Sequence, residues 1–298
     1  MEPRVVKPSE WAGAMDKPIR RLQRTFGCVL AVDQQGRSVT KGTGVFISIG
    51  EYKFVVTARH VIRSRKILGR RLLLMFTPIG ADGLAVSGEQ VVPISVPLGL
   101  QLVAESEPLD VAILRAPEAL ATHPAAKFLD GGKHADVVTR LRTRWRKYQT
   151  ETSDLPYIVL GFPNFGHLIE NVERRIETLS ASPLPAYVTQ LDEHPWDGHT
   201  MPAPQLLVEV DAREQGLVKP IRSARLRRIA RKLLHPTRDE PEPLGGFSGG
   251  EVVVLGNDGE FLLGIIKEGT QLFGSLRIAA SCWDDCLRAF ARSVPSTA

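Results

Sequence analysis

The sequence predicts an all-β protein with few helices, on the basis of three observations. Short runs rich in β-branched and aromatic residues recur along the chain, and residues that favour turns separate them. Helical spacing is confined to two segments, 217–240 and 281–293. The composition, 43% apolar and 24% charged in a chain of 298 residues, suits one bilobal domain or two small ones. Short strands at this spacing indicate a barrel or a sandwich.

Most of the predicted strands lie in the first 120 residues. Residues 1–22 are expected to form an N-terminal arm that precedes a first strand at 27–32. Residues 42–49 and 52–57 are expected to pair as a hairpin. The remaining strands predicted in this part are 72–76, 91–94, 100–103 and 110–115.

The middle of the chain has a mixed pattern. Residues 121–156 are expected to link two lobes. Arginine stands at every second position from Arg140 to Arg146, and a strand there would place these guanidinium groups on one face. Trp145 and Tyr148 would then be available for stacking on nucleic-acid bases. Further strands are predicted at 157–161, 206–210, 251–255 and 261–267.

A basic segment precedes the last two of these strands. Six arginine or lysine residues between Arg222 and Lys232 surround apolar residues at helical spacing, and Pro220 and Pro236 bracket the run. We interpret residues 217–240 as a basic amphipathic helix inserted into the β pattern. With the net charge of +5, this insertion suggests affinity for an acidic partner or for nucleic acid, and a solvated face is the plainer interpretation.

One loop carries the clearest chemical signal. Glycines stand on both sides of Ser248, from Gly245 to Gly250, and such a stretch forms a backbone loop instead of a helix or strand interior. An acyl-transfer enzyme needs an exposed nucleophile and N–H donors aimed at the developing oxyanion. This loop offers both, although by itself the motif also fits an ordinary turn.

Two other stretches of the sequence bear on the chemical role of this loop. Thr57-Ala58-Arg59-His60 resembles the Thr-Ala-Ala-His motif, and Asp110-Val111-Ala112-Ile113-Leu114 resembles the Asp-Ile-Ala-Leu-Leu motif, of the chymotrypsin/trypsin-like serine peptidase superfamily. Gly246-Phe247-Ser248-Gly249-Gly250 resembles its Gly-Asp-Ser-Gly-Gly motif. The three motifs stand in the family's order, and the resemblance, to bacterial members without disulfides, extends over about residues 25–293.

The resemblance implies a particular architecture. It predicts two antiparallel six-stranded β-barrels with a cleft between them, and a C-terminal helix at 281–293. The first barrel, residues 23–120, would carry His60 and Asp110, and the second, residues 157–298, would carry Ser248.

The resemblance also implies a role for each site residue. Ser248 would be the nucleophile, His60 the general base and then the acid, and Asp110 the group that orients the imidazole. The backbone N–H groups of Gly246 and Ser248 would form the oxyanion hole. Structural alternatives exist for each side chain: a turn serine, a histidine at a strand end, and an aspartate that caps a strand.

The substrate pocket is predicted from the same family. Residues 263–269 resemble the segment that lines it, which places Lys267 and Gly269 there, with Gly274 as a second glycine of the wall. Glu242 stands six residues before Ser248, where trypsin-like members carry the charge of the pocket floor, and would favour substrates with arginine or lysine. Prolines on both sides of Glu242 also fit an exposed loop.

Phe247 departs from the family pattern. Vertebrate members have an aspartate before the nucleophile, which pairs with an N-terminus released by cleavage. Because phenylalanine cannot form that ion pair, we expect no zymogen of that kind. The loop is then either preformed or ordered by another event.

Cysteine content and hydropathy bear on the location of the protein. Cys282 and Cys286 stand four apart on a predicted helix, which favours two thiols over a disulfide and a reducing compartment. Residues 1–24 have no apolar run of signal-peptide length, and no stretch approaches the roughly 18 apolar residues of a membrane helix. We expect a cytoplasmic bacterial protein with no membrane association, no cofactor and no metal site.

The sequence thus predicts an intracellular trypsin-like serine endopeptidase, restrained by a regulatory partner or an occluded cleft. Its partners would be a protein or peptide substrate and a regulatory protein. The alternative is a binding module with a peptidase fold, whose basic insertion binds an acidic partner or nucleic acid.

Overall fold

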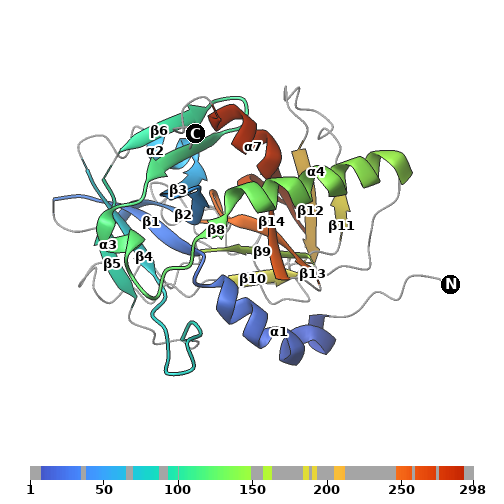
Figure 1. Ribbon diagram of the computed structural model, residues 1–298, viewed down its shortest axis with the longest axis horizontal. Helices are drawn as coiled ribbons and strands as arrows, with labels where there is room; N and C mark the ends of the chain where they lie inside the picture. Colours follow the sequence, from blue (N-terminus) through green and yellow to red (C-terminus); the bar gives the residue numbers. More distant parts are fainter. Residues whose placement is uncertain are drawn as a thin grey trace, which may run out of the picture.

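The structure is a computed structural model that describes most of the chain (Figure 1). The described residues are 8–34, 38–64, 70–86, 93–99, 101–148, 157–162, 184–187, 190–192, 205–211, 246–256, 259–272 and 275–291. They form two antiparallel sheets, one from each half of the chain, with helices packed against them. The predicted all-β class is therefore confirmed in its coarse form: mostly β, with a C-terminal helix.

The first sheet contains eight strands, in the order β5-β4-β1-β2-β3-β7-β6, with β8 parallel to β2. Its strands are β1 (Phe26–Val32), β2 (Ser38–Ile49), β3 (Tyr52–Ala58), β4 (Arg71–Phe76), β5 (Ile94–Pro97), β6 (Leu102–Ser106), β7 (Val111–Arg115) and β8 (Leu129–Asp130). The predicted hairpin is present, because Ile49 of β2 pairs with Tyr52 of β3. Gly50 begins its two-residue turn with a φ of 59°, a conformation that favours glycine there.

The second sheet contains seven strands, in the order β10-β9-β13-β14-β15-β12-β11. Its strands are β9 (Tyr157–Gly161), β10 (Leu184–Tyr187), β11 (Gln190–Asp192), β12 (Gln205–Asp211), β13 (Glu251–Gly256), β14 (Gly259–Leu272) and β15 (Ser275–Cys282). The described strands thus number eight and seven, where six and six were predicted.

The apolar residues of β1 show how the sheets form a core. All seven residues of this strand are buried, so both of its faces are covered. Cys28 and Leu30 belong to a large cluster that contains residues of both sheets, whereas Val29 belongs to a second cluster within the first half of the chain. Because strand side chains alternate between faces, β1 contributes to two cores at once.

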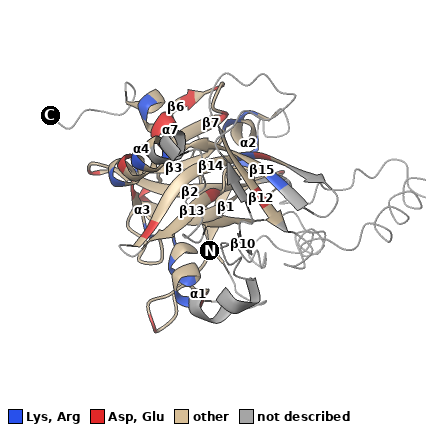
Figure 2. Cartoon of the chain, turned by 90° about the vertical axis from the view of Figure 1, so that its right-hand side faces the viewer, with Lys and Arg blue, Asp and Glu red and all other residues tan. Residues whose placement is uncertain are grey.

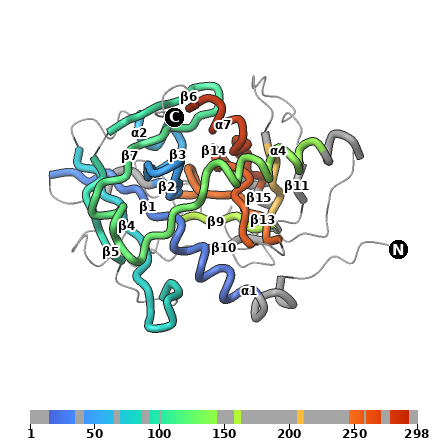
Figure 3. The backbone as a smooth tube through the Cα atoms, viewed as in Figure 1, coloured from blue at the N-terminus to red at the C-terminus, as the bar shows by residue number. Residues whose placement is uncertain are grey.

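Five described helices accompany the sheets: α1 (Pro8–Leu22), α2 (Arg59–Arg63), α3 (Glu118–Ala121), α4 (Gly131–Tyr148) and α7 (Trp283–Phe290). Figure 3 shows α4 beside α7, and α4 also contacts β14. His134 of α4 accepts a hydrogen bond at Nδ1 from the Leu262 N–H of β14, at 3.1 Å. Burial lowers the pKa of His134 to about 4, so this histidine is neutral at physiological pH. No helix in the described part of the chain is long and apolar enough to cross a membrane.

The strand predicted from the alternating arginines is wrong, because residues 139–148 belong to helix α4. Successive helical residues are about 100° apart, so arginines at every second position point in different directions. Arg140 is exposed and Arg142 is buried. The signal that was missed is the helical spacing of His134, Ala135 and Val138, which are buried on the same side of the helix.

Three other predictions concern the N-terminal arm, the linker and the basic helix. The N-terminal arm contains helix α1, whose Ile19 and Leu22 are buried in the large cluster. The described part of the predicted linker 121–156 contains β8 and α4. The predicted basic helix at 217–240 lies outside the described residues, as do the side chains of Trp145 and Tyr148.

Arg142 joins α4 to α7 through buried charges. Its Nη1 donates hydrogen bonds of 2.8 Å to both carboxylate oxygens of Asp284 and to Oδ2 of Asp285. Arg142 and Asp284 are each 4% exposed. Arg288 also donates to Asp284, at 3.1 Å. The guanidinium comes from α4 and the two carboxylates come from α7, so this buried cluster of charges forms only when the two helices pack together.

Replacing Arg142 with alanine is expected to destabilise the protein by about 3–5 kcal/mol, because it leaves buried carboxylates without their partner. The free energy of unfolding from denaturant titration measures this loss. Arg140→Ala, on the exposed side of the same helix, is the matched control and should change that free energy by no more than about 0.5 kcal/mol. Equal losses for the two variants would contradict a structural role of the buried cluster.

Candidate active site

His60 is the second residue of helix α2, directly after strand β3. The sequence placed it at a strand end, and the structure adds one short helical turn there. Val61 and Ile62 are buried and anchor this turn, while the His60 side chain is 51% exposed. The imidazole is therefore accessible, although its backbone is held by the core.

Asp110 lies in the turn between β6 and β7 and holds His60 at two points. Asp110 Oδ2 is 2.6 Å from His60 Nδ1, and Asp110 Oδ1 accepts the His60 backbone N–H at 3.0 Å. The Asp110 carbonyl also accepts the N–H of Arg59, at 2.8 Å. A carboxylate at Nδ1 places the proton on that nitrogen and leaves Nε2 as an acceptor. This is the tautomer that a general base needs.

Asp110 has a φ of 48°, in the left-handed region that disfavours residues other than glycine. Such a conformation costs roughly 1–2 kcal/mol, and aspartate tolerates it better than most residues. Residues held in this way cluster at functional sites, where surrounding contacts determine the backbone. Here the three hydrogen bonds to His60 and Arg59 do so.

Charged pairs on the surface join the same two elements. Arg63 of α2 donates two hydrogen bonds, of 2.8 and 2.9 Å, to the Glu105 carboxylate of β6. The hydrogen bond from Arg63 lowers the pKa of Glu105. Arg59 lies 3.4 Å from Glu105 and from Glu107. Figure 2 shows acidic residues on β6 and basic residues around α2. Exposed pairs contribute little stability, so their effect is mainly on orientation.

Ser248 lies in the turn that precedes β13, and buried Thr43 of β2 holds this turn. The Thr43 N–H donates to Ser248 O at 2.8 Å, and Thr43 Oγ1 donates to Gly246 O at 2.8 Å. A Cβ on Gly42 would lie 2.6 Å from the Val61 side chain and 3.1 Å from Ser248 O. The Ser248 backbone thus lies beside the residue that follows His60. The structure brings all three predicted triad positions to one place.

The side-chain contact between Ser248 and His60 is not formed. Ser248 is 8% exposed, and among the described residues no hydrogen bond joins its hydroxyl to His60. Such contacts are often long before substrate binds and tighten in the complex.

The backbone N–H groups of the loop divide into two sets. Those of Gly249 and Gly250 donate to Ile266 O and Phe247 O, at 2.7 Å each. Those of Gly246, Phe247 and Ser248 have no acceptor within the part of the chain that the structure describes. The second set contains the two donors predicted for the oxyanion hole.

Phe247 anchors the loop by packing. Its side chain is buried, and a Cβ on Gly161 of β9 would lie 2.8 Å from the Phe247 ring. The family aspartate would bring a charge to this position, whereas phenylalanine fills it with apolar surface. The loop is therefore held without an ion pair.

Glu251, which the sequence did not single out, lies behind the nucleophile loop. Its carboxyl is fully buried, and Oε2 has no hydrogen-bond partner among the described residues. Oε1 lies 3.0 Å from Thr25 Oγ1, and the Thr25 hydroxyl donates to Leu22 O at 2.6 Å. The single hydrogen of that hydroxyl is therefore shared between Leu22 O and Glu251 Oε1. Burial raises the pKa of Glu251 to about 8, which keeps the acid neutral.

The predicted pocket residues have different outcomes. Lys267 does not line an open pocket, because it is 1% exposed and its Nζ donates to Pro108 O at 3.4 Å. Gly269 is half-buried in β14 and pairs with Ile278. Glu242 and Gly274 lie outside the described residues. A cavity of about 450 Å³ lies elsewhere, against Tyr52, Gln101 and Arg115 among others, and no triad position lines it.

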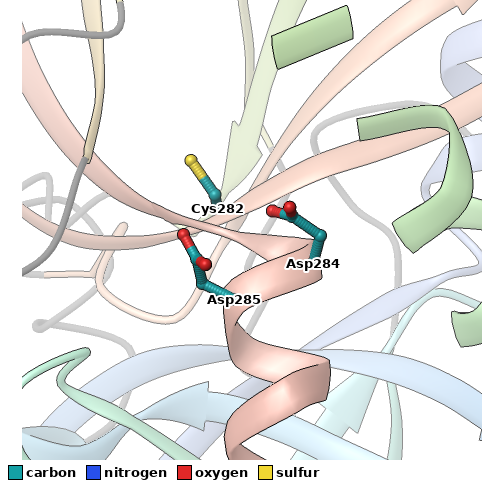
Figure 4. Close-up of side chains that lie close together, drawn as sticks. All are labelled: Cys282, Asp284 and Asp285. Atoms are coloured by element: carbon teal, nitrogen blue, oxygen red, sulfur yellow. The ribbon is translucent and has the colours of Figure 1, made fainter. Parts of the chain in front are cut away.

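Cys282, Asp284 and Asp285 lie close together where β15 meets α7 (Figure 4). Their ligand atoms lie within 4.8 Å of one another. Both carboxylates already accept hydrogen bonds from Arg142, and Arg288 also pairs with them. The two guanidinium groups supply the positive charge that a metal ion would bring, so these residues do not fit a metal centre.

Gly249→Ala is expected to destabilise the protein by about 2–5 kcal/mol, the sum of backbone strain and overpacking. Its φ is 85°, and a Cβ would lie 2.1 Å from Thr43 O and 2.4 Å from Thr57 Oγ1. Gly83 is the matched control, because it has a φ of 72° and nothing within 4 Å of a Cβ. Gly83→Ala should show only the strain, about 1–2 kcal/mol. Denaturant titration measures both, and equal losses would contradict the close contact at Thr43.

Glu251→Gln is expected to remove a pH dependence of stability. The folded-state pKa of about 8 is raised above the ordinary 4.5, so the stability contribution is complete below pH 4.5 and is lost as pH rises toward 8. The loss is about 4–5 kcal/mol over that range. Glutamine cannot ionise, and its amide can donate to Thr25. The unfolding free energies of the wild type and of Glu251→Gln, measured at pH 5, 6.5 and 8, should converge at low pH and diverge at high pH. Parallel curves for the two proteins would contradict a neutral buried acid.

No protein-family model matches the sequence, and no curated protein matches it. Solved structures of serine proteases do match, at low identity. A serine endoprotease from Yersinia pestis is 13% identical with a TM-score of 0.47; the match covers 93% of this chain and 65% of that one. The Rv3671c protease from M. tuberculosis in its active form is 14% identical with a TM-score of 0.47, over 96% and 88%.

The MamO protease domain from Magnetospirillum magneticum is 13% identical with a TM-score of 0.46, over 93% of this chain and 100% of that one. The chain is thus similar in structure to trypsin-like serine proteases over most of its length.

Proposed function

We propose that this protein is a serine endopeptidase that hydrolyses peptide bonds through an acyl-enzyme. The observation that carries the proposal is the pair of hydrogen bonds between Asp110 and His60, formed beside a serine loop that Thr43 holds against the same sheet. His60 and Asp110 directly adjoin strands β3 and β7 of the first sheet, and Ser248 lies in the turn before β13 of the second, which also supports the two-barrel architecture expected from the sequence.

The mechanism follows from these positions. His60 Nε2 takes the proton of the Ser248 hydroxyl as Oγ attacks the carbonyl carbon of the peptide bond. The oxyanion accepts hydrogen bonds from the N–H groups of Gly246 and Ser248, and each such donor is worth roughly 2.7–4 kcal/mol. Asp110 stabilises the imidazolium, which then protonates the leaving amine as the C–N bond breaks. Water, activated by His60, hydrolyses the acyl-enzyme.

Phe247 supports a loop that is ready before any activating cleavage. Its burial against Gly161 and the hydrogen bonds from Thr43 hold the loop with contacts inside the chain. Restraint of the enzyme would then come from a regulatory partner or from an occluded cleft, as the sequence predicts. A preference for arginine or lysine substrates through Glu242 stays a prediction from the sequence.

An intracellular location is part of the same proposal. Cys28, Cys282 and Cys286 are buried and form no disulfide, which is compatible with a reducing compartment. The alternative function, binding of an acidic partner or nucleic acid, loses one of its candidate groups, because Arg142 is buried against Asp284. It now depends on residues 222–232 and on the other arginines of 140–146, of which Arg140 is exposed.

Labelling with a fluorophosphonate probe tests the proposal. The wild-type protein should be labelled, and Ser248→Ala and His60→Ala should lower the labelling rate by more than about 10⁴-fold, because the nucleophile and its base act as one unit. Ser95→Ala, an exposed serine on β5, is the control and should be labelled like the wild type. Labelling that survives Ser248→Ala, or none in the wild type under any condition, would overturn the assignment.

A further inference from the structure

We propose that the cavity of about 450 Å³ in the first half of the chain is a binding site for a short zwitterionic peptide. The carboxylate of the peptide lies against Lys53 and Arg115, and its ammonium group lies against Glu51 and Glu118. No triad position lines this cavity, so the inference goes beyond the proposed function and does not rest on it.

The cavity lies at one end of the first sheet. Glu51 belongs to the turn between β2 and β3, Lys53 belongs to β3, Arg115 ends β7 and Glu118 begins α3. Strands β3 and β7 are antiparallel, and Phe54 pairs with Arg115, so both strands reach the cavity with the end that lies farther from the triad. A strand of seven residues such as β3 spans roughly 20 Å. A ligand in the cavity therefore leaves the triad free.

Two cations at the cavity are positioned without the help of a carboxylate. Lys53 Nζ donates to Ala121 O at 2.5 Å and lies 5.0 Å from the centre of the Phe128 ring. Cζ of Arg115 lies 5.3 Å from the centre of the Tyr52 ring. Neither cation forms an ion pair with any residue that the structure describes. Lys53 keeps two N–H donors, and stacking on tyrosine leaves the edge of the Arg115 fork open to a planar carboxylate.

Two carboxylates line the same cavity, and they are unpaired as well. Glu51 and Glu118 are exposed, and within the described parts of the chain no ion pair joins either of them to Lys53 or Arg115. Two charges of each sign thus line one cavity without neutralising one another. A simple anion would be repelled by the glutamates, and a simple cation would be repelled by Lys53 and Arg115. A ligand that carries one charge of each sign complements both pairs.

The dimensions of the cavity favour a peptide over a free amino acid. Its volume falls within the range of roughly 300–1,000 Å³ that is typical of small-molecule sites. A sphere of this volume is roughly 9–10 Å across, which is the length of an extended tripeptide. Gly99, Ala116 and Ala121, which also line the cavity, are small and leave room for a peptide backbone with short side chains.

Isothermal titration calorimetry with trialanine tests the proposal. The full-length Ser248→Ala protein is used, so that hydrolysis by the proposed peptidase contributes no heat. We expect one site with a dissociation constant on the order of 0.1–1 mM, as the binding efficiency of small ligands implies for a peptide of this size. N-acetyl-trialanine lacks the ammonium group and trialanine amide lacks the carboxylate. Each should bind at least about tenfold more weakly, because one charge-assisted contact is lost.

Variants of the lining residues locate the site. Nothing lies within 4 Å of a Cβ added to Gly99, so the ring of Gly99→Phe has room in the cavity and should abolish binding. Arg115→Gln and Glu118→Gln each remove one charge at an exposed position and should weaken trialanine binding by about tenfold. Arg140→Gln is the matched control, because Arg140 is exposed on α4 and does not line the cavity. It should leave the dissociation constant unchanged.

Three results would overturn the proposal. The first is the absence of saturable heat with trialanine up to about 10 mM, at least tenfold above the expected dissociation constant. The second is equal affinity for trialanine and its acetylated or amidated forms. The third is unchanged affinity in Gly99→Phe, which would place the peptide elsewhere, for example in the cleft beside Ser248. Cooperative thermal unfolding checks that each variant folds, and if Gly99→Phe does not, unchanged affinity in both Arg115→Gln and Glu118→Gln is the overturning result. The labelling experiment tests the endopeptidase proposal separately.

Discussion

The arrangement of the site depends on the hydrogen bonds of one buried threonine. Thr43 donates its N–H and its hydroxyl to the serine loop, and its hydroxyl oxygen accepts the N–H of Phe162 at 3.1 Å. Its carbonyl accepts the Thr57 hydroxyl at 2.6 Å, on the strand that leads to His60. A single residue of the first sheet therefore supplies the hydrogen-bond donors for two carbonyl groups of the loop from the second. Any shift between the sheets would break several of these bonds together.

Two buried ionisable groups, Glu251 and Lys267, lie at this junction, and burial shifts the pKa of each in the direction that favours its neutral form. Glu251, behind the serine loop, is kept neutral by burial and accepts a hydrogen bond from Thr25. Lys267, behind the turn of Asp110, has the ionised aspartate as its main counter-charge. The region around Ser248 thus carries no buried negative charge from Glu251, and the negative charge of the site is concentrated at Asp110, where an imidazolium needs it.

Much of this could be predicted from the sequence, for identifiable reasons. The hairpin of β2 and β3 was predicted because apolar alternation and a glycine turn are local signals. His60, Asp110 and Ser248 were predicted from motifs, and the structure places them together. Helix α4 was misread because the alternating arginines were taken as a pattern of their own, although the buried residues before them have helical spacing. Thr43 had a signal, its position between two glycines, which was not used.

The sequence by itself indicated a mostly β fold, many of its strands and the three residues proposed as a triad, but it did not predict β8, β10, β11 or β15. Only the tertiary structure decided which buried polar groups meet. Thr25 and Glu251 are 226 residues apart in the chain, and Arg142 and Asp284 are 142 apart. The physical reason is that periodicity reports which face of an element is buried, whereas the partner of a buried charge depends on how distant elements pack. The neutral Glu251, the turn held by Lys267 and the burial of Arg142 all arise from such packing.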